Sequence, residues 1–508
     1  MSNKSSNNKV MTISDIMLIA EEHYNNAQYN KSINLYDQIL TNYPNNYKAL
    51  FSRAKSLRKI NKFQEALVDL NVLLDLPVTK YIVHIHMADN LRSLHLYDEA
   101  IDNYRKAIEI KPDHEATYIP AVHLMIMHDR FHEAVDVVDN GIKYLPESSD
   151  ILSLKGKVHS RLKEFDKAEE AYDKALSTSP REKIKHIITN ETAIIKDKLG
   201  KYDEAMKLML ISQNEAKMRP EYKQYNTNET DNFISSAQKK VNTSEWNDNI
   251  GDNKKDPIFL VGFPRSGTTL MEQILFSHPH LIVTDELGIM PAMNLNIHEV
   301  FNKKFIYPND FNNITEEEIS LWRKEYFERM KRNIPNYDSK LRIVDKNPMS
   351  FVYLLAVKKF FPQSPILMMI RDPRDVILSC FFQNFVPNSS NAHFFSLEDS
   401  AKYYADAMSL YLQFRKNLGL NIMQVKYEDL CDDLEPNLRK IINHIGEDWD
   451  DNLLEYYNQE HRYIQTPSFE AVKEPVSKKA IGKWINYEKY FKPILPILEP
   501  YLNEFSYC

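Results

Sequence analysis

The first part of the chain has a hydrophobic pattern that repeats every 34 residues. Aromatic residues recur at this spacing, at Tyr29, Phe63, Tyr97, Phe131 and Phe165. A small residue follows each of them three positions later, and prolines recur at intervals of 33 to 35 residues from Pro44 to Pro180. Within a stretch such as "AIDNYRKAIEIKP", apolar and small residues at i, i+3, i+4 and i+7 predict one face of a helix. The pattern therefore predicts two helices per repeat, with a proline closing the second.

A sixth, looser copy follows in "GKYDEAMKLMLIS", which contains Tyr202 and Ala205. The period of 34 and the placing of the aromatic, small and proline positions resemble the tetratricopeptide repeat. The resemblance implies an α-solenoid of about six repeats over residues 13–220, after a disordered start at residues 1–12. Solenoids of this kind offer a concave surface to a partner.

In tetratricopeptide geometry, the first helix of each repeat lines that concave surface. The basic residues that this register implies on it are Lys48, Lys55, Arg58, Lys59, Arg92, Lys157 and Arg161. A basic groove in an acidic protein favours an acidic peptide partner, with the substrate itself as one candidate. The alternative is that these are solvated side chains on an ordinary helix face.

The pattern changes after the repeats. Residues 221–255 are polar and rich in asparagine, which predicts a linker with room for one short helix. From residue 256 onward, short apolar runs alternate with helical periodicity; the runs are "PIFLVG", "LRIVD", "PILMMIR" and "NIMQVKY". This alternation predicts a parallel sheet covered by helices on both faces, a three-layer α/β domain over residues 256–508. The whole chain is thus expected to be α-helical first and α/β afterwards.

Composition narrows the class of protein. The formal net charge of −7 argues against a nucleic-acid partner. No run of 18 or more apolar residues is present and the polar start lacks a signal-peptide core, so we expect a cytoplasmic protein with no membrane partner. The three cysteines, at positions 380, 431 and 508, are too scattered for a disulfide framework or a zinc site, and we expect no metal.

One short segment, "FLVGFPRSGTTLMEQIL", has most of the features of a phosphate-binding loop. Gly262, Gly267 and Thr269 have the spacing of a Walker A motif, but Thr268 stands where that motif has its lysine, and Arg265 lies inside the loop. A strand, a tight turn and a helix beginning near Thr268 would aim backbone N–H groups and a helix dipole at one anion. Arg265 and the hydroxyl groups of the loop add further donors.

The segment G-x-P-R-S-G-T-T resembles the 5′-phosphosulfate loop of sulfotransferases that use 3′-phosphoadenosine 5′-phosphosulfate (PAPS). The resemblance implies that this loop binds the donor through Arg265, Ser266, Gly267, Thr268 and Thr269. A second segment, "ILMMIRDPRDVILSCFF", carries an arginine and a serine eight residues apart. In that family the pair, here Arg371 and Ser379, holds the 3′-phosphate. Arginine offers a planar fork that suits a phosphate group.

Two further residues would supply the chemistry. Glu286, in "LIVTDELGIM", resembles the catalytic base of tyrosylprotein sulfotransferases and of bacterial sulfotransferases fused to tetratricopeptide repeats. Lys346, in "VDKNP", resembles the lysine that these families place against the sulfuryl group, and Arg265 would assist it. The resemblance covers about residues 256–495, and the preceding repeats match the bacterial architecture.

Later segments extend the resemblance to the nucleotide. Tyr427, Ser477 and Lys483 match positions that contact PAPS, and Ser468 matches a transition-state contact. The chain also departs from the animal enzymes: Gln383 stands where they have a second arginine for the 3′-phosphate. Thr284 and Asp285 replace a Gly-Glu pair before the base, which bears on the acceptor pocket.

The function predicted from these residues is transfer of the sulfuryl group of PAPS to an acceptor hydroxyl, with peptide tyrosine as one candidate acceptor. A carbohydrate or small-molecule sulfotransferase would share the whole donor site. A repeat scaffold with a non-catalytic nucleotide-binding domain is the alternative outside enzymes. A P-loop kinase would require a lysine at position 268, although "LRIVD", ending in Asp345, imitates a Walker B strand.

Overall fold

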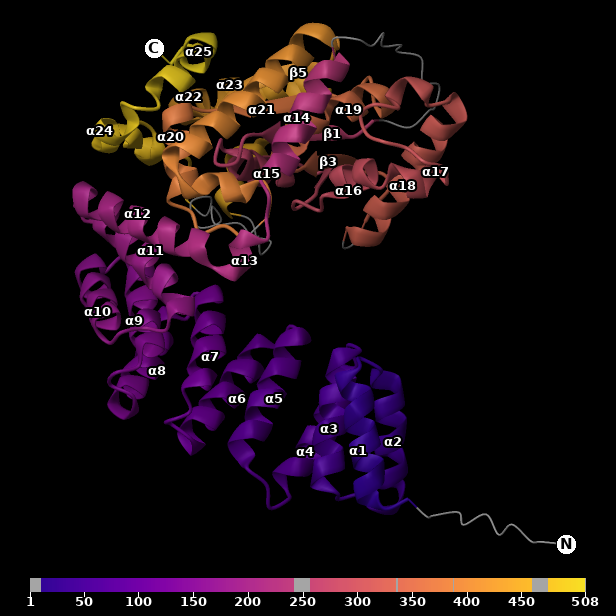
Figure 1. The fold of residues 1–508 in the computed structure, drawn as a ribbon, viewed down its shortest axis with the longest axis vertical. Helices are drawn as coiled ribbons and strands as arrows, with labels where there is room; N and C mark the ends of the chain where they lie inside the picture. Colours follow the sequence, from indigo (N-terminus) through magenta and orange to yellow (C-terminus); the bar gives the residue numbers. More distant parts are fainter. Residues whose placement is uncertain (1–10, 242–255, 335–336, 387, 459–473, 508) are drawn as a thin grey trace, which may run out of the picture. The chain divides into compact units, whose positions relative to one another are not determined.

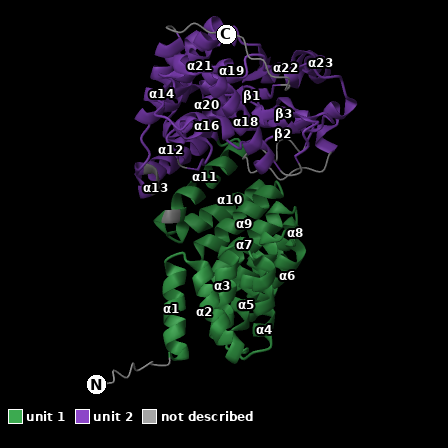
Figure 2. Ribbon diagram, turned by 90° about the vertical axis from the view of Figure 1, so that its right-hand side faces the viewer, with its two compact units in different colours: residues 1–201 green, residues 202–508 purple. Residues whose placement is uncertain are grey.

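The computed structural model describes residues 11–241, 256–334, 337–386, 388–458 and 474–507. Contacts divide the chain into two compact units, residues 1–201 and residues 202–508, which Figure 2 shows in different colours. Each unit has its own hydrophobic core.

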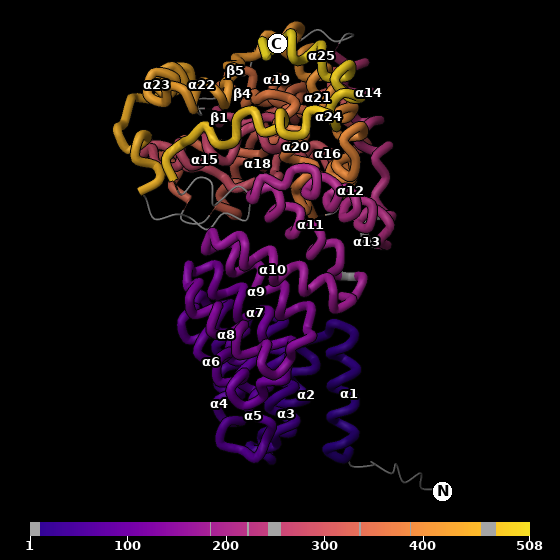
Figure 3. The backbone as a smooth tube through the Cα atoms, turned by 90° about the vertical axis from the view of Figure 1, so that its left-hand side faces the viewer, coloured from indigo at the N-terminus to yellow at the C-terminus, as the bar shows by residue number. Residues whose placement is uncertain are grey.

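The described part of the first unit is built from helices that run antiparallel in successive pairs (Figures 1 and 3). Their bounds are α1 Ile13–Asn25, α2 Tyr29–Asn42, α3 Tyr47–Lys59, α4 Phe63–Leu74, α5 Lys80–Ser93, α6 Tyr97–Ile110, α7 Glu115–Met127, α8 Phe131–Tyr144, α9 Ser149–Arg161, α10 Phe165–Ser177 and α11 Glu182–Lys198. Five of these pairs, α1–α2 to α9–α10, correspond to the five close sequence copies.

The repeated residues have a common structural role. The aromatic residue of each copy is the first residue of the second helix in its pair. The small residue three positions later is completely buried in every copy; these residues are Ser32, Ala66, Ala100, Ala134 and Ala168. A small side chain there lets the paired helices pack closely, so the 34-residue pattern predicted the helical pairs correctly.

The turn inside each pair contains a residue in the left-handed region, two positions before the aromatic residue. The φ angles are 57° at Ala27, 62° at Asn61, 61° at His95, 56° at Asp129 and 61° at Lys163. Residues other than glycine adopt this region rarely. The backbone conformation therefore repeats every 34 residues although the residue type does not.

The second unit contains a five-stranded parallel sheet. The strands are β1 Ile258–Gly262, β2 Leu281–Val283, β3 Arg342–Lys346, β4 Ile366–Ile370 and β5 Ile422–Lys426, in the order β2-β3-β1-β4-β5. The register places Leu260 of β1 beside Lys346 of β3, and Gly262 beside Met369 of β4. Every residue of β1 and β4 is buried, as expected for strands in the middle of a parallel sheet.

Helices surround the sheet; those of this unit are α12 Tyr202–Met218, α13 Pro220–Lys223, α14 Asn228–Val241, α15 Thr268–Phe276, α16 Ile289–Leu295, α17 Ile297–Phe301, α18 Glu316–Asn333, α19 Leu354–Phe360, α20 Pro373–Phe381, α21 Leu397–Asn417, α22 Tyr427–Asp432, α23 Leu434–Ile445, α24 Glu488–Phe491 and α25 Leu495–Glu504. Short 3-10 helices are η1 Phe311–Asn313, η2 Pro348–Tyr353, η3 Asn391–Phe395, η4 Asp451–Leu454, η5 Tyr456–Asn458, η7 Lys478–Ala480 and η8 Lys483–Tyr487.

The two faces of the sheet pack against different helices. On one face, Leu260 belongs to an apolar cluster with Leu270 of α15 and Ile441 of α23. On the other face, the ring of Phe259 lies 5.9 Å from that of Phe361, which packs against Trp322 of α18. Successive residues of β1 thus point into opposite helical layers, and the predicted three-layer α/β domain is confirmed.

Helices α12 and α14 pack within the second unit, although the sequence placed them in the sixth repeat and the linker. Gln213 of α12 donates a hydrogen bond to the carbonyl oxygen of Phe381 at 2.5 Å. Helix α14 packs against α21, and its Phe233 ring stacks on Tyr307 at 5.4 Å. The contact boundary thus lies between Lys201 and Tyr202. In the described ranges, no helix is both long enough and apolar enough to cross a membrane.

Candidate active site

The candidate site lies where the parallel strands end. Strands β1, β3 and β4 end at Gly262, Lys346 and Ile370, at one edge of the sheet. Open α/β sheets bind ligands at this edge, where the strand order reverses. The structure thereby brings together the loop after β1, the lysine that ends β3 and Arg371, which directly follows β4.

The loop after β1 requires glycine at two positions. A Cβ atom on Gly262 would lie 2.6 Å from Ser266 Oγ and 2.8 Å from the carbonyl oxygen of Met369. Gly267 has a φ of 104°, and a Cβ atom there would lie 2.7 Å from the ring of Tyr427. Close packing fixes the first glycine, whereas backbone conformation and packing together fix the second. Arg265, between them, has a φ of 71°.

The loop leads into the N-terminus of α15, where the structure has the features of an anion site. The first N–H groups of a helix have no acceptor inside the helix, and the helix dipole makes this end positive. Ser266, Thr268 and Thr269 are all buried there. Within the described residues, the buried Ser266 Oγ has no hydrogen-bond partner. A buried hydroxyl without a partner costs about 1–3 kcal/mol, so its position suits a bound acceptor group such as phosphate.

Arg265 of this loop contacts an arginine and a serine from the segment after β4. The Nε atom of Arg265 donates to Ser379 Oγ at 2.9 Å, and Arg371 Nη1 donates to the carbonyl oxygen of Arg265 at 3.0 Å. Burial lowers the pKa of Arg265, and the neighbouring Arg371 charge adds to this effect. A bound anion would offset both contributions.

Arg371 has an unpaired nitrogen, Nε, available for a ligand. Its Nη2 atom donates to the carbonyl oxygen of Ala480 at 2.5 Å, and its guanidinium group lies 5.0 Å from the centre of the Tyr427 ring. Its Nε atom is buried and has no hydrogen-bond partner in the described part of the chain. The side chain is therefore held in place by the protein while its Nε–H group stays unsatisfied.

The C-terminal segment reaches the site through Asp375. Its carboxylate accepts hydrogen bonds from the backbone N–H groups of Gly482 at 2.7 Å and Trp484 at 2.9 Å. Lys483 lies between these two residues, so the structure places it near Arg371. Ser477 is exposed at the start of η7, and among the described residues no hydrogen bond joins it to the strand ends. Ser468 lies outside the described residues.

The predicted base and lysine are in direct contact. Lys346 is completely buried, and its Nζ atom lies 2.7 Å from Glu286 Oε1. A second carboxylate, Glu272 of α15, places Oε2 2.7 Å from the same Nζ atom, and Asp285 is 3.9 Å away. The backbone N–H of Glu286 donates to the carbonyl oxygen of Lys346 at 3.1 Å, which fixes the two residues relative to each other. Glu286 is the accessible carboxylate, because its side chain is 41% exposed and that of Glu272 only 3%.

Burial and charge act in opposite directions in this cluster. Burial lowers the pKa of Lys346, but the carboxylates of Glu272 and Glu286 outweigh it and the net pKa is raised. Lys346 is therefore an ammonium ion at neutral pH. Burial raises the pKa of Glu272 to about 7, although Lys346 opposes the rise. A buried carboxyl group near its titration point is typical of functional sites.

Sequence reasoning missed Glu272 and Asp375. The signal for Glu272 was a lone acid in the otherwise apolar helix "TTLMEQILF", and Asp375 stands four residues after Arg371. Neither pattern predicts a contact with a residue in a distant segment, which is Lys346 for Glu272 and Gly482 and Trp484 for Asp375. Asp345 ends the segment that resembles a Walker B strand. It is buried and accepts a hydrogen bond from the hydroxyl of Tyr326 at 2.9 Å.

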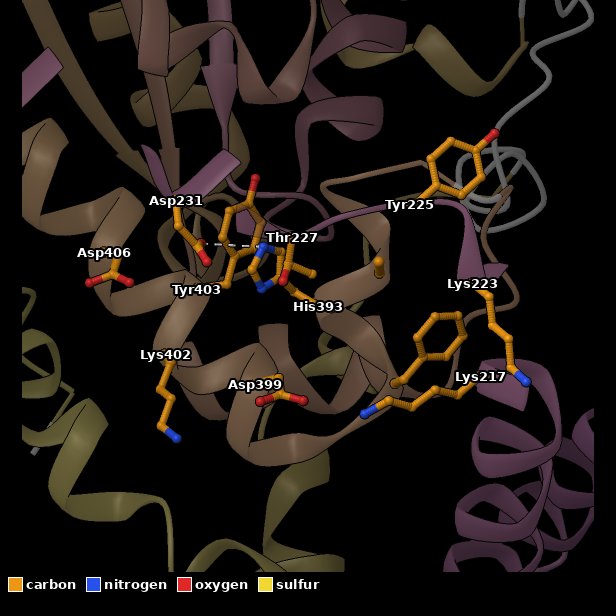
Figure 4. Close-up of a pocket in the computed structure, with 12 residues that line it drawn as sticks. Lys217, Lys223, Tyr225, Thr227, Asp231, His393, Asp399, Lys402, Tyr403 and Asp406 are labelled. Carbon is orange, nitrogen blue, oxygen red and sulfur yellow. Dashed lines mark ion pairs between the residues drawn. The ribbon is translucent and has the colours of Figure 1, made fainter. Parts of the chain in front are cut away.

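A separate cavity of about 440 Å³ lies in the same unit (Figure 4). Its lining comes from α12, α13, α14, η3 and α21 and from the segment between α13 and α14, and it is rich in lysines, aspartates and aromatic residues. None of the predicted site residues is among them. His393 stacks on Tyr403 with ring centres 4.2 Å apart, and Tyr403 packs against Phe263, the residue after β1. An aromatic layer thus stands between this cavity and the loop. In the described ranges, no group of three or more His, Cys, Asp or Glu side chains could hold a metal ion.

Comparison with protein families agrees with this geometry. Residues 257–451 match the sulfotransferase family, and residues 17–75, 83–114 and 149–182 match the tetratricopeptide repeat. The chain therefore combines tetratricopeptide repeats with a sulfotransferase-family domain.

Individual relatives are about a quarter identical to the chain over the residues that align. An uncharacterized protein of Aquifex aeolicus is 25% identical over 82% of this chain and 59% of its own length. Protein-tyrosine sulfotransferase A of Caenorhabditis elegans is 27% identical over 46% of this chain and 63% of its own length. An omega-hydroxy-beta-dihydromenaquinone-9 sulfotransferase of Mycobacterium bovis is 22% identical over 43% of this chain and 70% of its own length. The chain thus spans less than two thirds of the first two relatives.

Among solved structures, a tetratricopeptide repeat protein from Parabacteroides merdae matches with 16% identity and a TM-score of 0.34. The match covers 45% of this chain and 86% of that protein.

Proposed function

We propose that the chain transfers the sulfuryl group of PAPS to an acceptor hydroxyl. The observation that carries this proposal is the contact between Lys346 and Glu286, 2.7 Å apart at the strand ends beside an anion-binding loop. An ammonium ion and an accessible carboxylate at an anion site are the groups that sulfuryl transfer requires, because negative charge develops and a proton must leave. The match of residues 257–451 to the sulfotransferase family supports this reading.

The identity of the donor is inferred from two anion sites. The N-terminus of α15, with the unpaired Ser266 Oγ, would bind the 5′-phosphosulfate. The unpaired Nε of Arg371 and the hydroxyl of Ser379 would bind the 3′-phosphate, a group that ATP and ADP lack. Tyr427, Ser477 and Lys483 are the remaining candidates for contacts with the nucleotide, and Ser468 for one in the transition state. The lysine that a P-loop kinase needs is replaced by Thr268.

The reaction is an in-line displacement at sulfur. The acceptor oxygen forms a new bond to sulfur while the bond from sulfur to the 5′-phosphate oxygen breaks, and its electron pair leaves with 3′-phosphoadenosine 5′-phosphate (PAP). Glu286 takes the proton of the acceptor hydroxyl, a step typically worth about 10²–10⁴-fold. Lys346 and Arg265 stabilise the negative charge on the sulfuryl and leaving oxygens, in the manner of preorganised electrostatic catalysis.

The names of the relatives point to two classes of acceptor. Relatives named for protein tyrosine and for a hydroxylated menaquinone both match the chain. The repeats favour a peptide, because tetratricopeptide arrays offer an extended surface that suits one. We propose a division of labour in which the repeats recruit the acceptor and residues 256–508 carry out the reaction.

Several charges of the expected basic groove are already balanced inside the repeat unit. Arg58 lies 2.9 Å from Asp89, and Arg92 lies 3.9 Å from the same carboxylate. Lys55 lies 5.3 Å from the centre of the Tyr24 ring. The exposed Lys48 and Lys59 are therefore the groove residues best placed to meet an acidic peptide.

Incubation with ³⁵S-labelled PAPS tests the proposal. Peptides, glycans, small phenols and cell extract are offered as acceptors, without added metal. Transfer of label without Mg²⁺ supports sulfuryl transfer, and its acceptor identifies the class. Phosphate transfer from ATP that depends on Mg²⁺ would favour a kinase. Tight PAP binding with no transfer to any acceptor would favour a scaffold with a non-catalytic domain.

A further inference from the structure

The ammonium group of Lys346 is held by two carboxylates that come from different elements. Glu286 follows β2 and is accessible, whereas Glu272 lies on α15 with its side chain 3% exposed. Both carboxylate oxygens lie 2.7 Å from Nζ. The base proposed above accounts for Glu286 only, and Glu272 has no part in proton transfer from an acceptor because it is buried.

Glu272 is an unfavourable residue for its position unless it has a specific role. Its neighbours on α15, Met271, Ile274 and Leu275, belong to the apolar core beneath the sheet. Replacing a buried ion pair by apolar residues of similar volume is often neutral or stabilising, so packing alone does not favour a glutamate here. The contact with Lys346 is what the carboxylate adds.

We propose that Glu272 is a positioning residue for sulfuryl transfer, whose carboxylate holds the Lys346 ammonium group in place while Glu286 reacts. This inference rests on the proposed function. The ammonium group of Lys346 donates a hydrogen bond to Glu286 and forms an ion pair with Glu272, each at 2.7 Å. Since Glu286 takes up a proton during the reaction, its attraction for Lys346 weakens at that moment. The ion pair with Glu272 persists and keeps the ammonium group beside the reacting oxygens.

Helix α15 connects the contact between Glu272 and Lys346 to the donor loop. The helix begins at Thr268, and its N-terminal end forms the anion site. Glu272 lies one turn further along. One short rigid element therefore positions both the donor loop and the lysine. The backbone of Lys346 is fixed as well, because its N–H donates to Thr284 Oγ1 at 2.9 Å.

The charged groups that face Glu272 come from two elements. They are Lys346 at the end of β3, and Asp285 and Glu286 in the segment after β2. The two acids favour protonation of Glu272 and Lys346 favours its ionisation. Because Lys346 is the only cation that these interactions place against Glu272 in the described structure, replacing Glu272 by glutamine should act on Lys346.

The first test uses the full chain without donor or acceptor. Pulse labelling with acetic anhydride, followed by mass spectrometry, measures the reactivity of the Lys346 amine as a function of pH. Glu272→Gln should raise the labelling rate of Lys346 by at least ~10-fold, the change expected when one close contact between charged groups is lost. Glu272→Asp, which keeps the charge, should restore part of the protection. Asp345→Asn is the matched control, since it also turns a buried carboxyl group into an amide but one that faces Tyr326.

The second test separates positioning from folding. PAP affinity, measured by calorimetry, should be unchanged in Glu272→Gln, which would show that the fold and the donor site are intact. With ³⁵S-labelled PAPS and 4-nitrophenol, kcat should fall at least ~10-fold while KM for PAPS changes little, because the contact acts in the transition state. Glu272→Asp should recover part of kcat.

The outcomes distinguish the two proposals. Equal labelling of Lys346 in wild type and Glu272→Gln, with PAP binding intact, would overturn the positioning role whatever the activity. Normal kcat in Glu272→Gln beside an active wild type would overturn it as well. An inactive wild type would count against the proposed function instead, and the labelling result would still decide whether Glu272 holds Lys346.

Discussion

The Nε atom of Arg265 donates a hydrogen bond to Ser379 Oγ at 2.9 Å, although 114 residues separate them in the sequence. One residue belongs to the loop after β1 and the other to the helix after β4. Strands β1 and β4 are neighbours in the sheet, so the loops that follow them meet. The contact joins the proposed sites for the two phosphate-bearing ends of PAPS through a single pair of side chains.

Donor specificity should depend on Arg371. We expect the chain to bind PAP in clear preference to ADP, and Arg371→Ala to remove this preference at a cost of about 1.5–3 kcal/mol, the value for a hydrogen bond to a charged group. Calorimetric titration of both proteins with both nucleotides measures this preference. Arg374→Ala is the control, because that guanidinium group binds Asp372 at 2.7 Å and lies over Trp484. Equal affinities for PAP and ADP in the wild type would contradict the assignment.

Glu286 should be needed for turnover and not for binding. Glu286→Gln keeps the size of the side chain but not its basicity, so turnover should fall at least ~100-fold, as for a lost general base. PAP affinity should be unchanged. The matched variant is Asp285→Asn, at the neighbouring carboxylate 3.9 Å from Lys346. If Asp285→Asn lost activity and Glu286→Gln kept it, Asp285 would be the base.

Removal of Lys346 should destabilise the fold as well as the reaction. Lys346→Ala leaves the buried Glu272 without its partner, and breaking a buried pair typically costs about 3–5 kcal/mol in the free energy of unfolding. The double variant Lys346→Ala/Glu272→Gln should lose less than the sum of the two single changes. Urea unfolding at neutral pH measures all three. Additive losses would show that the two side chains do not interact. Among molecules that fold, kcat of Lys346→Ala should fall more than KM rises.

Asp345 should make stability depend on pH. Burial raises its pKa to about 6 from the ordinary 3.8, so the folded state binds a proton more tightly than the unfolded state. This contribution to stability is complete below the unfolded pKa and is lost as pH rises through the folded value. Relative to wild type, Asp345→Asn should therefore gain about 2 kcal/mol in the free energy of unfolding between about pH 4 and about pH 8. A pH-independent difference would mean that Asp345 titrates normally.

The groove of the repeats should act on peptide acceptors only. In the full chain, Lys48→Glu with Lys59→Glu should raise KM for an acidic tyrosine peptide and reduce its dependence on salt, because electrostatic attraction to the groove is lost. KM for a small phenol should stay the same. The matched control changes two exposed lysines on second helices, Lys106→Glu and Lys174→Glu. Equal effects of the two double variants on the peptide would show that the groove does not recruit it.

The structural roles of residues within one helix, strand or turn could be predicted from the sequence. The 34-residue pattern predicted the helical pairs, because a buried small residue and an aromatic residue at a helix start are set by local periodicity. The glycines of the loop were visible because a tight strand-to-helix turn has few sequence solutions. Arg371 and Ser379 were paired by resemblance to a family; in the structure each of them bonds to Arg265, Ser379 through Nε and Arg371 through the carbonyl oxygen.

The tertiary structure alone decided which side chains meet across elements. Glu272 and Lys346 lie on a helix and a strand more than 70 residues apart, and their contact depends on the order β3-β1 in the sheet. The sequence pattern assigned helix α12 to a sixth repeat and helix α14 to the linker, yet both pack within the second unit. Local patterns fix which face of an element is apolar, but not which other face buries it. Strand order and packing determine that pairing, and they depend on the whole chain at once.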